Sequence, residues 1–111
     1  MAVRMEKPWL PLTAEGVAEL SGDLGVYQIA DSEGMVVYIG YAGGRSLWGL
    51  QGELREQLAE RGDGHGFRVE INHQYLSRWE ELLKVHMGDH GTLPAGNEHH
   101  RPRRIGRLSL G

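Results

Sequence analysis

Residues 25–30 read Gly-Val-Tyr-Gln-Ile-Ala, and residues 35–39 read Met-Val-Val-Tyr-Ile. Both runs are rich in β-branched and aromatic residues, which favour β-strands. The intervening residues 31–34, Asp-Ser-Glu-Gly, form a good four-residue turn with glycine in the last position. The two runs therefore predict a β-hairpin that carries Tyr27 and Tyr38 on adjacent strands.

These two tyrosines are the first candidate site residues, because phenols on adjacent strands can meet on one face of a sheet. A tyrosine hydroxyl near a phosphodiester can orient an attacking water molecule or share a proton with it. Its reference pKa of about 10 makes it a weak base at neutral pH, so catalysis would need a nearby cation. The competing interpretation is that Tyr27 and Tyr38 simply pack across the hairpin.

A helix is expected after the hairpin. Residues 40–44 contain three glycines and predict a loop, after which leucines recur at helical spacing, at positions 47, 50, 54 and 58. Ser46 is a suitable N-cap for this helix. Gly49 and Gly52 indicate either close backbone packing or a later helix start, because glycine weakens a helix interior.

Three further elements complete the expected fold. Residues 13–21 predict a short helix with Thr13 as its N-cap. Residues 67–71 alternate between apolar and polar side chains and predict a half-buried strand. From Tyr75, apolar residues follow an amphipathic helical pattern that Gly91 ends. The order of elements predicts a small α/β domain with a three-stranded, mostly antiparallel sheet flanked by helices.

Charge is distributed unevenly along the chain. The 111 residues include 12 Lys and Arg and 15 Asp and Glu, for a net charge of −3. All 15 acidic residues and eight of the basic ones precede Arg101, so residues 1–100 carry −7 and residues 101–111 carry +4. An acidic body is a poor general binder of nucleic acid, because phosphate contact relies on clustered Lys and Arg. The basic tail is either a phosphate-binding arm or a solvated terminus.

Cysteine usage and the first residues bear on the compartment. The absence of Cys excludes disulfides, thiolate metal sites and cysteine nucleophiles. Residues 1–12 contain charges and prolines but no long apolar run, so they predict neither a signal peptide nor a membrane span. These features favour a cytoplasmic protein with no membrane among its partners.

The hairpin, with Gly-Val-Tyr at residues 25–27 and Tyr-Ile-Gly at residues 38–40, resembles the GIY-YIG family of endonucleases. That family includes the amino-terminal domain of the bacterial nucleotide-excision-repair incision subunit, homing endonucleases of phage introns and some restriction enzymes. The resemblance covers residues 22–97. It leaves residues 1–21 as an N-terminal segment with a short helix and residues 98–111 as the basic C-terminal tail.

The resemblance implies an α/β sandwich and a DNA endonuclease that uses one divalent cation. Tyr27 would act on the attacking water, and Tyr38 would support the scissile phosphate. Gly40 would form the tight turn after the second strand. Glu80 would hold Mg²⁺ or Mn²⁺, and Glu81, about 100° away around the helix, is the alternative ligand.

The resemblance also suggests which residues contact DNA. Residues 94–97, Pro-Ala-Gly-Asn, resemble the family's closing Pro-x-x-Asn, so Asn97 is expected to help close the site. The expected DNA-binding set is Gly40, Arg55, Asn97, Arg101, Arg103 and Arg104.

The sequence departs from the family pattern at the phosphate-binding arginine. In the best alignment of the helix after the hairpin, Glu53 stands where the family has arginine, and Gln57 stands where it often has histidine. Arg45, in the glycine-rich loop, is the expected substitute, and Arg55 is less apt because it lies on another face of the helix. The alternative function is therefore a catalytically impaired module of the same fold that binds nucleic acid or a protein partner, including a second copy of itself.

Two other groups of residues have competing interpretations. His86 and His90 are spaced four apart and could bind zinc, but no third ligand is obvious, so histidines used for packing or exposed at the surface are the favoured interpretation. Trp48 and Trp79 fall on apolar helix faces and are expected in the core.

Overall fold

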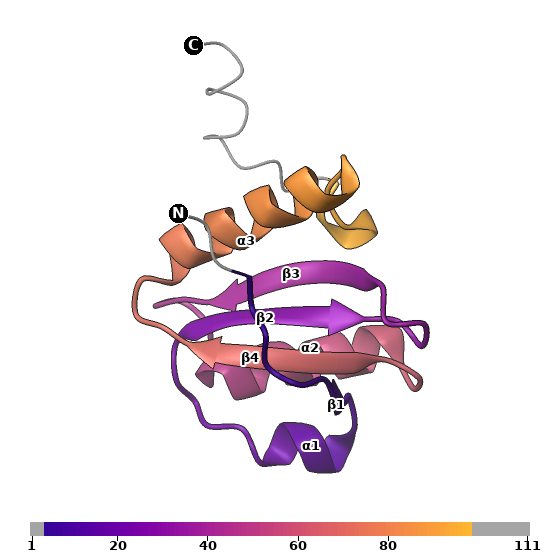
Figure 1. Ribbon diagram of the computed structural model, residues 1–111. Coiled ribbons are helices and arrows are strands. Elements are labelled where there is room, and N and C mark those ends of the chain that lie inside the picture. The colour runs from indigo at the N-terminus through magenta and orange to yellow at the C-terminus, as the bar shows by residue number, and fades with distance from the viewer. Residues whose placement is uncertain (1–3, 99–111) are drawn as a thin grey trace.

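The computed structural model describes residues 4–98. Its elements, in chain order, are β1 (Leu10–Pro11), α1 (Ala14–Ala18), β2 (Gly25–Ala30), β3 (Val36–Ala42), α2 (Gly49–Arg61), β4 (Gly66–Ile71), α3 (Tyr75–His90) and the 3₁₀ turn η1 (Ala95–Asn97). The strands form one antiparallel sheet in the order β1-β4-β2-β3. The helices lie against this sheet, with α3 on one face and α1 and α2 on the other (Figure 1). The small α/β fold with an antiparallel sheet is therefore confirmed.

The prediction of three strands is wrong by one. β1 is a two-residue strand in which Leu10 and Pro11 pair with Phe67 and Gly66 of β4. Its sequence contains proline and is too short to alternate, so it carries no strand pattern. Proline is tolerated there because an edge strand leaves one side of its backbone unpaired. The addition of β1 places β4 and β2 in the interior of the sheet.

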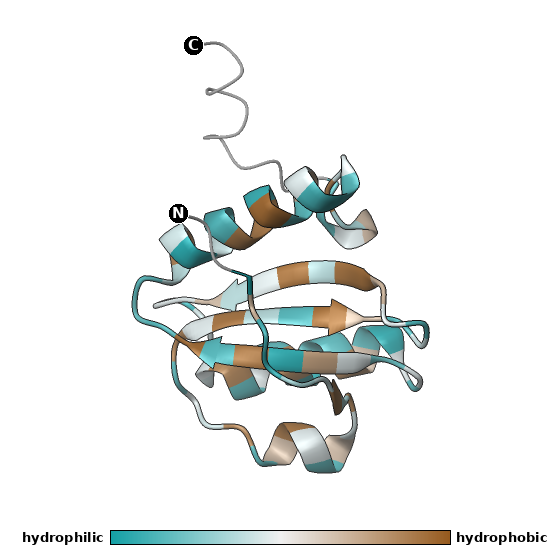
Figure 2. Cartoon of the chain, in the orientation of Figure 1, coloured by the Kyte–Doolittle hydropathy of each residue, from teal (hydrophilic) through white to brown (hydrophobic). Residues whose placement is uncertain are grey.

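The sheet separates two hydrophobic clusters. On the α1 and α2 side, buried residues from the strands pack with Leu50 and Leu54. On the α3 side, Val26 and Ile39 pack with Leu82 and Leu83. Figure 2 shows hydrophobic and hydrophilic residues alternating along β4, as expected for a strand whose two faces differ in burial. No helix among residues 4–98 is long and apolar enough to cross a membrane.

The hairpin is confirmed, but β3 is longer than expected. It continues to Ala42, so Gly40 lies inside the strand and not in a turn after it. α2 begins late, at Gly49, as one interpretation of its glycines predicted. Ser46 is not the N-cap; its hydroxyl accepts a hydrogen bond from the Gly43 N–H at 2.9 Å.

The segment before α2 explains why the helix begins late. A Cβ on Gly49 would lie 2.1 Å from the Gly22 carbonyl oxygen, and a Cβ on Gly52 would lie 2.0 Å from that of Leu47. Trp48 precedes the helix with a φ of 66°, in the left-handed region that few non-glycine residues adopt. Its side chain is 63% exposed, so the prediction that Trp48 belongs to the core is wrong, whereas Trp79 is partly buried against the α3 side.

Candidate functional site

The two hairpin tyrosines meet on the face of the sheet that α2 covers. Tyr27 is paired with Gly40 in the β2–β3 register, and Ile29 is paired with Tyr38, so the tyrosines occupy diagonal positions. Their ring centroids are 6.0 Å apart, with an angle of 44° between the planes. The structure thus brings together the two residues that the hairpin pattern singled out.

Gly40 makes this arrangement possible. A Cβ at this position would lie 2.4 Å from Cζ of Tyr27, so the phenol occupies the space that any other side chain would need. A glycine inside a strand often marks such a close approach. Gly40 is buried inside β3, so the expectation that it forms a tight turn after the strand is wrong, whereas its contact with DNA stays a prediction.

Three α2 residues spaced four apart point toward the tyrosines: Glu53, Gln57 and Arg61. The Tyr27 hydroxyl donates to Oε1 of Glu53 at 3.4 Å and accepts from Nε2 of Gln57 at 3.4 Å. Nε of Arg61 donates to Oε1 of Gln57 at 2.7 Å, and Cζ of Arg61 lies 5.5 Å from the centre of the Tyr38 ring. Arg61 is therefore the arginine beside the tyrosines. Sequence reasoning missed it, although its spacing of four from Gln57 places it on the same helix face.

Both phenols are held in the neutral form. Burial raises the pKa of Tyr27 far above its ordinary value. Electrostatic interactions with Tyr38 and Glu53 raise this pKa further, and the hydrogen bond from Gln57 offsets these effects only in part. Burial, followed by the Glu53 charge, also raises the pKa of Tyr38, whereas a hydrogen bond with Tyr27 and the Arg61 charge lower it. Each phenol thus remains a hydrogen-bond donor at neutral pH.

A cleft of about 840 Å³ opens at the outer edge of β3, and we call it the β3 cleft. Residues from β3, the loop of residues 43–47, α2 and α3 line it. Its polar side chains include those of Tyr38, Arg45, Glu53 and Glu56. Tyr27 is only 1% exposed and lies behind Tyr38, so Tyr38 is the hairpin tyrosine that a bound molecule would meet.

The predicted arginines separate into two groups. Arg45 is exposed and lines the β3 cleft. Arg55 points away from it, toward α1: its Nη2 donates to Gln51, whose own amide donates to the carbonyl oxygens of Ala18 and Leu20. The structure therefore does not place Arg55 among the residues that would contact a ligand in the cleft. The predicted tail residues Arg101, Arg103 and Arg104 lie outside the described part of the chain.

The candidate metal ligands on α3 also differ in environment. Glu81 forms an ion pair with Arg78, which is also bound to Glu70. Glu80 is half-buried and lies one turn after the cleft-lining Leu76, but it does not itself line the cleft. Within residues 4–98, no three His, Asp or Glu side chains converge in a way that would hold a metal ion. The carboxylates that face the cleft are those of Glu53 and Glu56.

Asn97 has a positioning role. Its side chain is fully buried; Oδ1 accepts from the Ile39 N–H at 2.7 Å, and Nδ2 donates to the Ile39 carbonyl at 2.9 Å. The asparagine thus satisfies the outward-facing backbone groups of an edge strand, between Tyr38 and Gly40. Both ends of its amide are used inside the protein, so the structure supports a positioning role for Asn97, and its contact with DNA stays a prediction.

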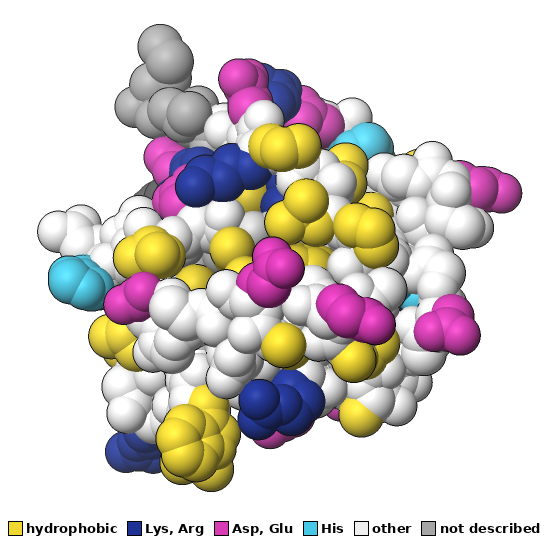
Figure 3. Space-filling model, turned by 90° about the horizontal axis from the view of Figure 1, so that it is seen from below, with side chains coloured by type: hydrophobic (Ala, Val, Ile, Leu, Met, Phe, Trp, Pro, Cys, Tyr) yellow, Lys and Arg dark blue, Asp and Glu magenta, His cyan; other side chains and the backbone are white. Residues whose placement is uncertain are grey.

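The outer surface carries no continuous basic patch on the face seen in Figure 3, where Lys and Arg side chains are separated by acidic and hydrophobic ones. Binding of nucleic acid to this face would therefore rely on separate basic side chains and on bound cations.

Comparison with known proteins identifies a family but no activity. A family model described as a domain of unknown function (DUF7508) matches residues 3–89, and the chain belongs to this family. No curated protein and no solved structure matched the chain. The function must therefore be argued from the site itself.

Proposed function

We propose that this member of the DUF7508 family is a GIY-YIG-type domain that cleaves DNA phosphodiester bonds at the β3 cleft with the help of a divalent cation. The observation that carries the proposal is the convergence of Tyr38, Arg45 and Glu53 on one cleft, with Tyr27 packed behind Tyr38. A phenol, a guanidinium and a carboxylate are the groups that would orient water, bind phosphate and hold a cation.

Arg45 is the proposed phosphate ligand. Its side chain is exposed and lines the cleft, in the loop of residues 43–47 between β3 and α2. A guanidinium presents a planar set of donors that matches two phosphate oxygens and keeps its charge at every relevant pH. Arg61 is turned toward the Tyr38 ring, so it would support that tyrosine and not the phosphate directly.

Tyr38 is the proposed group that orients water or a phosphate oxygen. Its raised pKa keeps the hydroxyl protonated, so it would donate a hydrogen bond and would not remove a proton. Tyr27 is buried and contacts Glu53, so its proposed role is to position the carboxylate and the second phenol.

The cleft carboxylates fit a divalent cation. Mg²⁺ needs only one or two protein carboxylates and keeps several waters, and Glu53 and Glu56 supply that number. Such a cation, when bound, supplies charge for the phosphate oxygens and lowers the pKa of a bound water. In this proposal Glu53, which stands where the GIY-YIG family has arginine, holds the cation in place of Glu80. The charge of the bound cation would then offset the repulsion between the Glu53 carboxylate and the phosphate.

A catalytically impaired module is the second candidate, and a specific observation favours it. Tyr27 is only 1% exposed and its hydroxyl donates to Glu53, so this phenol is shielded from substrate in the described conformation. A domain of this kind would use the β3 cleft to bind nucleic acid or a protein partner without cutting.

Nuclease and binding assays on one preparation separate the two candidates. Labelled single-stranded, duplex and branched DNA would be incubated with Mg²⁺ or Mn²⁺ and the wild type, Glu53→Gln, Glu80→Gln and the exposed control Glu33→Gln. We expect cleavage by the wild type and control, and a loss of roughly 100-fold or more in Glu53→Gln, comparable to removal of one preorganised electrostatic group in other enzymes.

Each other outcome has a definite meaning. If Glu80→Gln alone loses cleavage, the cation ligand would be Glu80, the residue that the family resemblance implies, and not Glu53. Binding without cleavage in every variant would establish the impaired module. Absence of both cleavage and binding would overturn a DNA-directed function.

A further inference from the structure

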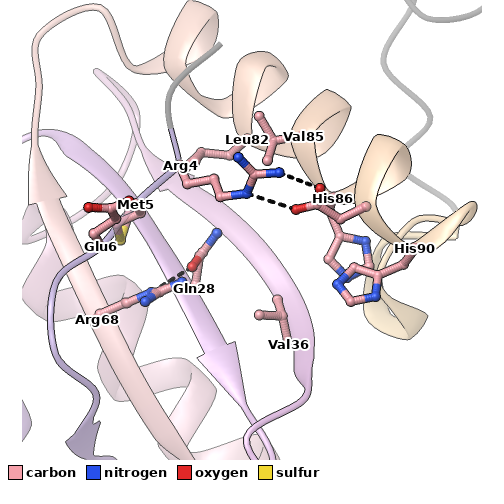
Figure 4. Close-up of a pocket in the computed structure, with 11 residues that line it drawn as sticks. Arg4, Met5, Glu6, Gln28, Val36, Arg68, Leu82, Val85, His86 and His90 are labelled. Carbon is pink, nitrogen blue, oxygen red and sulfur yellow. Dashed lines mark hydrogen bonds and ion pairs between the residues drawn. The ribbon is translucent and has the colours of Figure 1, made fainter.

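A second cavity lies on the opposite face of the sheet from the tyrosines. It has a volume of about 240 Å³ and lies between α3, strands β2 and β3, and the segment that precedes β1. We call it the α3 pocket. His86 and His90 project from α3 at one end of it, with their rings side by side (Figure 4). These are the two histidines whose spacing was compatible with a metal site.

The environment of His86 is unusual for a packing residue. Its side chain is 8% exposed, and Nδ1 lies 2.8 Å from the Thr92 carbonyl oxygen. Because a carbonyl only accepts, Nδ1 must carry the proton and Nε2 must present its lone pair. That Nε2 is buried and has no hydrogen-bond partner within residues 4–98. Buried polar atoms are nearly always satisfied, so this atom calls for a ligand.

His90 supplies a second imidazole at the same place. It lies one turn after His86, and the two ring centroids are 4.4 Å apart with 35° between the planes. His90 is exposed, so its own ring is accessible from solvent. The arrangement of His86, with one nitrogen bonded to a backbone carbonyl and the other left as an acceptor, is the one that metal-binding histidines normally have.

We propose that Nε2 of His86 and the His90 ring form a two-imidazole site for a late first-row transition-metal ion, with Cu²⁺ bound more tightly than Ni²⁺ or Zn²⁺. Asp89 is adjacent but is held by two hydrogen bonds from Arg4. Water or a small ligand would complete the coordination shell. Burial lowers the pKa of His86, which supports the neutral form that a metal needs.

The test uses Cu²⁺ as the probe, with the full chain carrying His99→Ala and His100→Ala as the parent. Those two histidines lie outside the described residues and could bind metal themselves. In this parent, His90→Ala is compared with His73→Ala, which removes an exposed histidine away from the pocket. Affinity is measured by calorimetric titration, and the number of nitrogen ligands by electron paramagnetic resonance.

We expect two coordinating nitrogens in the parent and in His73→Ala. His90→Ala should bind Cu²⁺ about tenfold or more weakly, since loss of a group that merely supports a metal ligand already costs roughly 10- to 100-fold. Because His90 is exposed, this variant should fold normally, and circular dichroism checks that it does. Equal affinity in parent and His90→Ala, or a single-nitrogen signal in the parent, would overturn the proposal. The α3 pocket and the β3 cleft share no lining residue, so its test is independent of DNA cleavage.

Discussion

Two polar networks flank β3, and they differ in the quality of their hydrogen bonds. On the outer edge, Ile39 is bonded to Asn97 at 2.7 and 2.9 Å, and its carbonyl accepts a further bond from Trp79 at 2.9 Å. On the α2 side, the hydrogen bonds that the Tyr27 hydroxyl makes with Glu53 and Gln57 are each 3.4 Å long. The first network is complete, and the second is loose and contains an ionisable group.

This difference separates scaffold from site. A buried network with short, fully used bonds stabilises one geometry, because breaking any member leaves a buried group without a partner. A network with long bonds next to a cleft contributes less to stability and is free to change partners when a ligand arrives. We therefore expect the edge network to determine stability and the tyrosine network to determine function.

Removal of Asn97 is the strongest test of this contrast. Asn97→Ala should lower the free energy of unfolding by about 2–4 kcal/mol, because the buried Ile39 N–H loses its partner and a second bond is lost. Chemical denaturation measures the change. The neighbouring exposed residue provides a matched control, since Glu98→Ala should change stability by no more than about 0.5 kcal/mol. An Asn97→Ala protein as stable as this control would show that the edge network is dispensable.

The contact between Gly40 and Tyr27 provides a second test of the comparison. Gly40→Ala forces a methyl group against the phenol ring and should cost about 1–3 kcal/mol of unfolding free energy, as overpacking does in other cores. The penalty should shrink in a Tyr27→Leu background, because the nearer of the two obstructing rings is gone, although Cε2 of Tyr38 would still lie 2.8 Å from the methyl group. A double-mutant cycle measures this coupling. Equal penalties in both backgrounds would mean that Gly40 is required for some other reason.

Most of the fold followed from local patterns, and the exceptions have physical causes. The hairpin, β4 and α3 were predictable because their periodicity is strong and glycine ends α3. β1 was not, because two residues cannot alternate and their strand conformation comes from pairing with β4. The late start of α2 depends on close backbone approach between Gly49 and the Gly22 carbonyl, which is a tertiary contact.

The site was predictable only in part. The meeting of Tyr27 and Tyr38 follows from the hairpin alone. The inward position of Arg61 depends on the rotation of α2 against the sheet, which a local pattern does not determine. The burial of Asn97 likewise depends on where η1 reaches the edge of β3, far away in sequence.

Arg78 extends the comparison to the α3 side. It is 10% exposed and donates two hydrogen bonds to Glu70 at 2.9 and 3.1 Å, so this network also belongs to the scaffold. Arg78→Met should lower the free energy of unfolding by about 1.5–3 kcal/mol near pH 7, the range for hydrogen bonds between charged groups.

The effect of Arg78→Met should depend on pH in a defined direction. Burial alone would raise the pKa of Glu70, but hydrogen bonds from Arg78 and Asn72 more than offset this and hold it below its ordinary value. A carboxylate whose pKa is lower in the folded state contributes its full stabilisation at pH values above the unfolded-state pKa of about 4.3. This contribution is lost as the pH falls through the pKa of the folded state. The difference in the free energy of unfolding between wild type and Arg78→Met should therefore become smaller below about pH 4.3. A gap that stays constant down to pH 3 would exclude the Glu70 carboxylate as its source.

Tyr27→Phe should have the smallest effect on stability and is the sharpest test of the other network. It removes only the hydroxyl, with its two long hydrogen bonds to Glu53 and Gln57 and its hydrogen bond with Tyr38, so the free energy of unfolding should change by no more than about 1 kcal/mol. If Tyr27 positions Glu53, cleavage or binding at the β3 cleft should nevertheless weaken, and both quantities are measured on the same preparation. A stability loss as large as that of Asn97→Ala would place Tyr27 in the scaffold, because a hydroxyl that the fold depends on is not free to change partners. An unchanged activity would instead leave Tyr38 as the only hairpin phenol with a part in function.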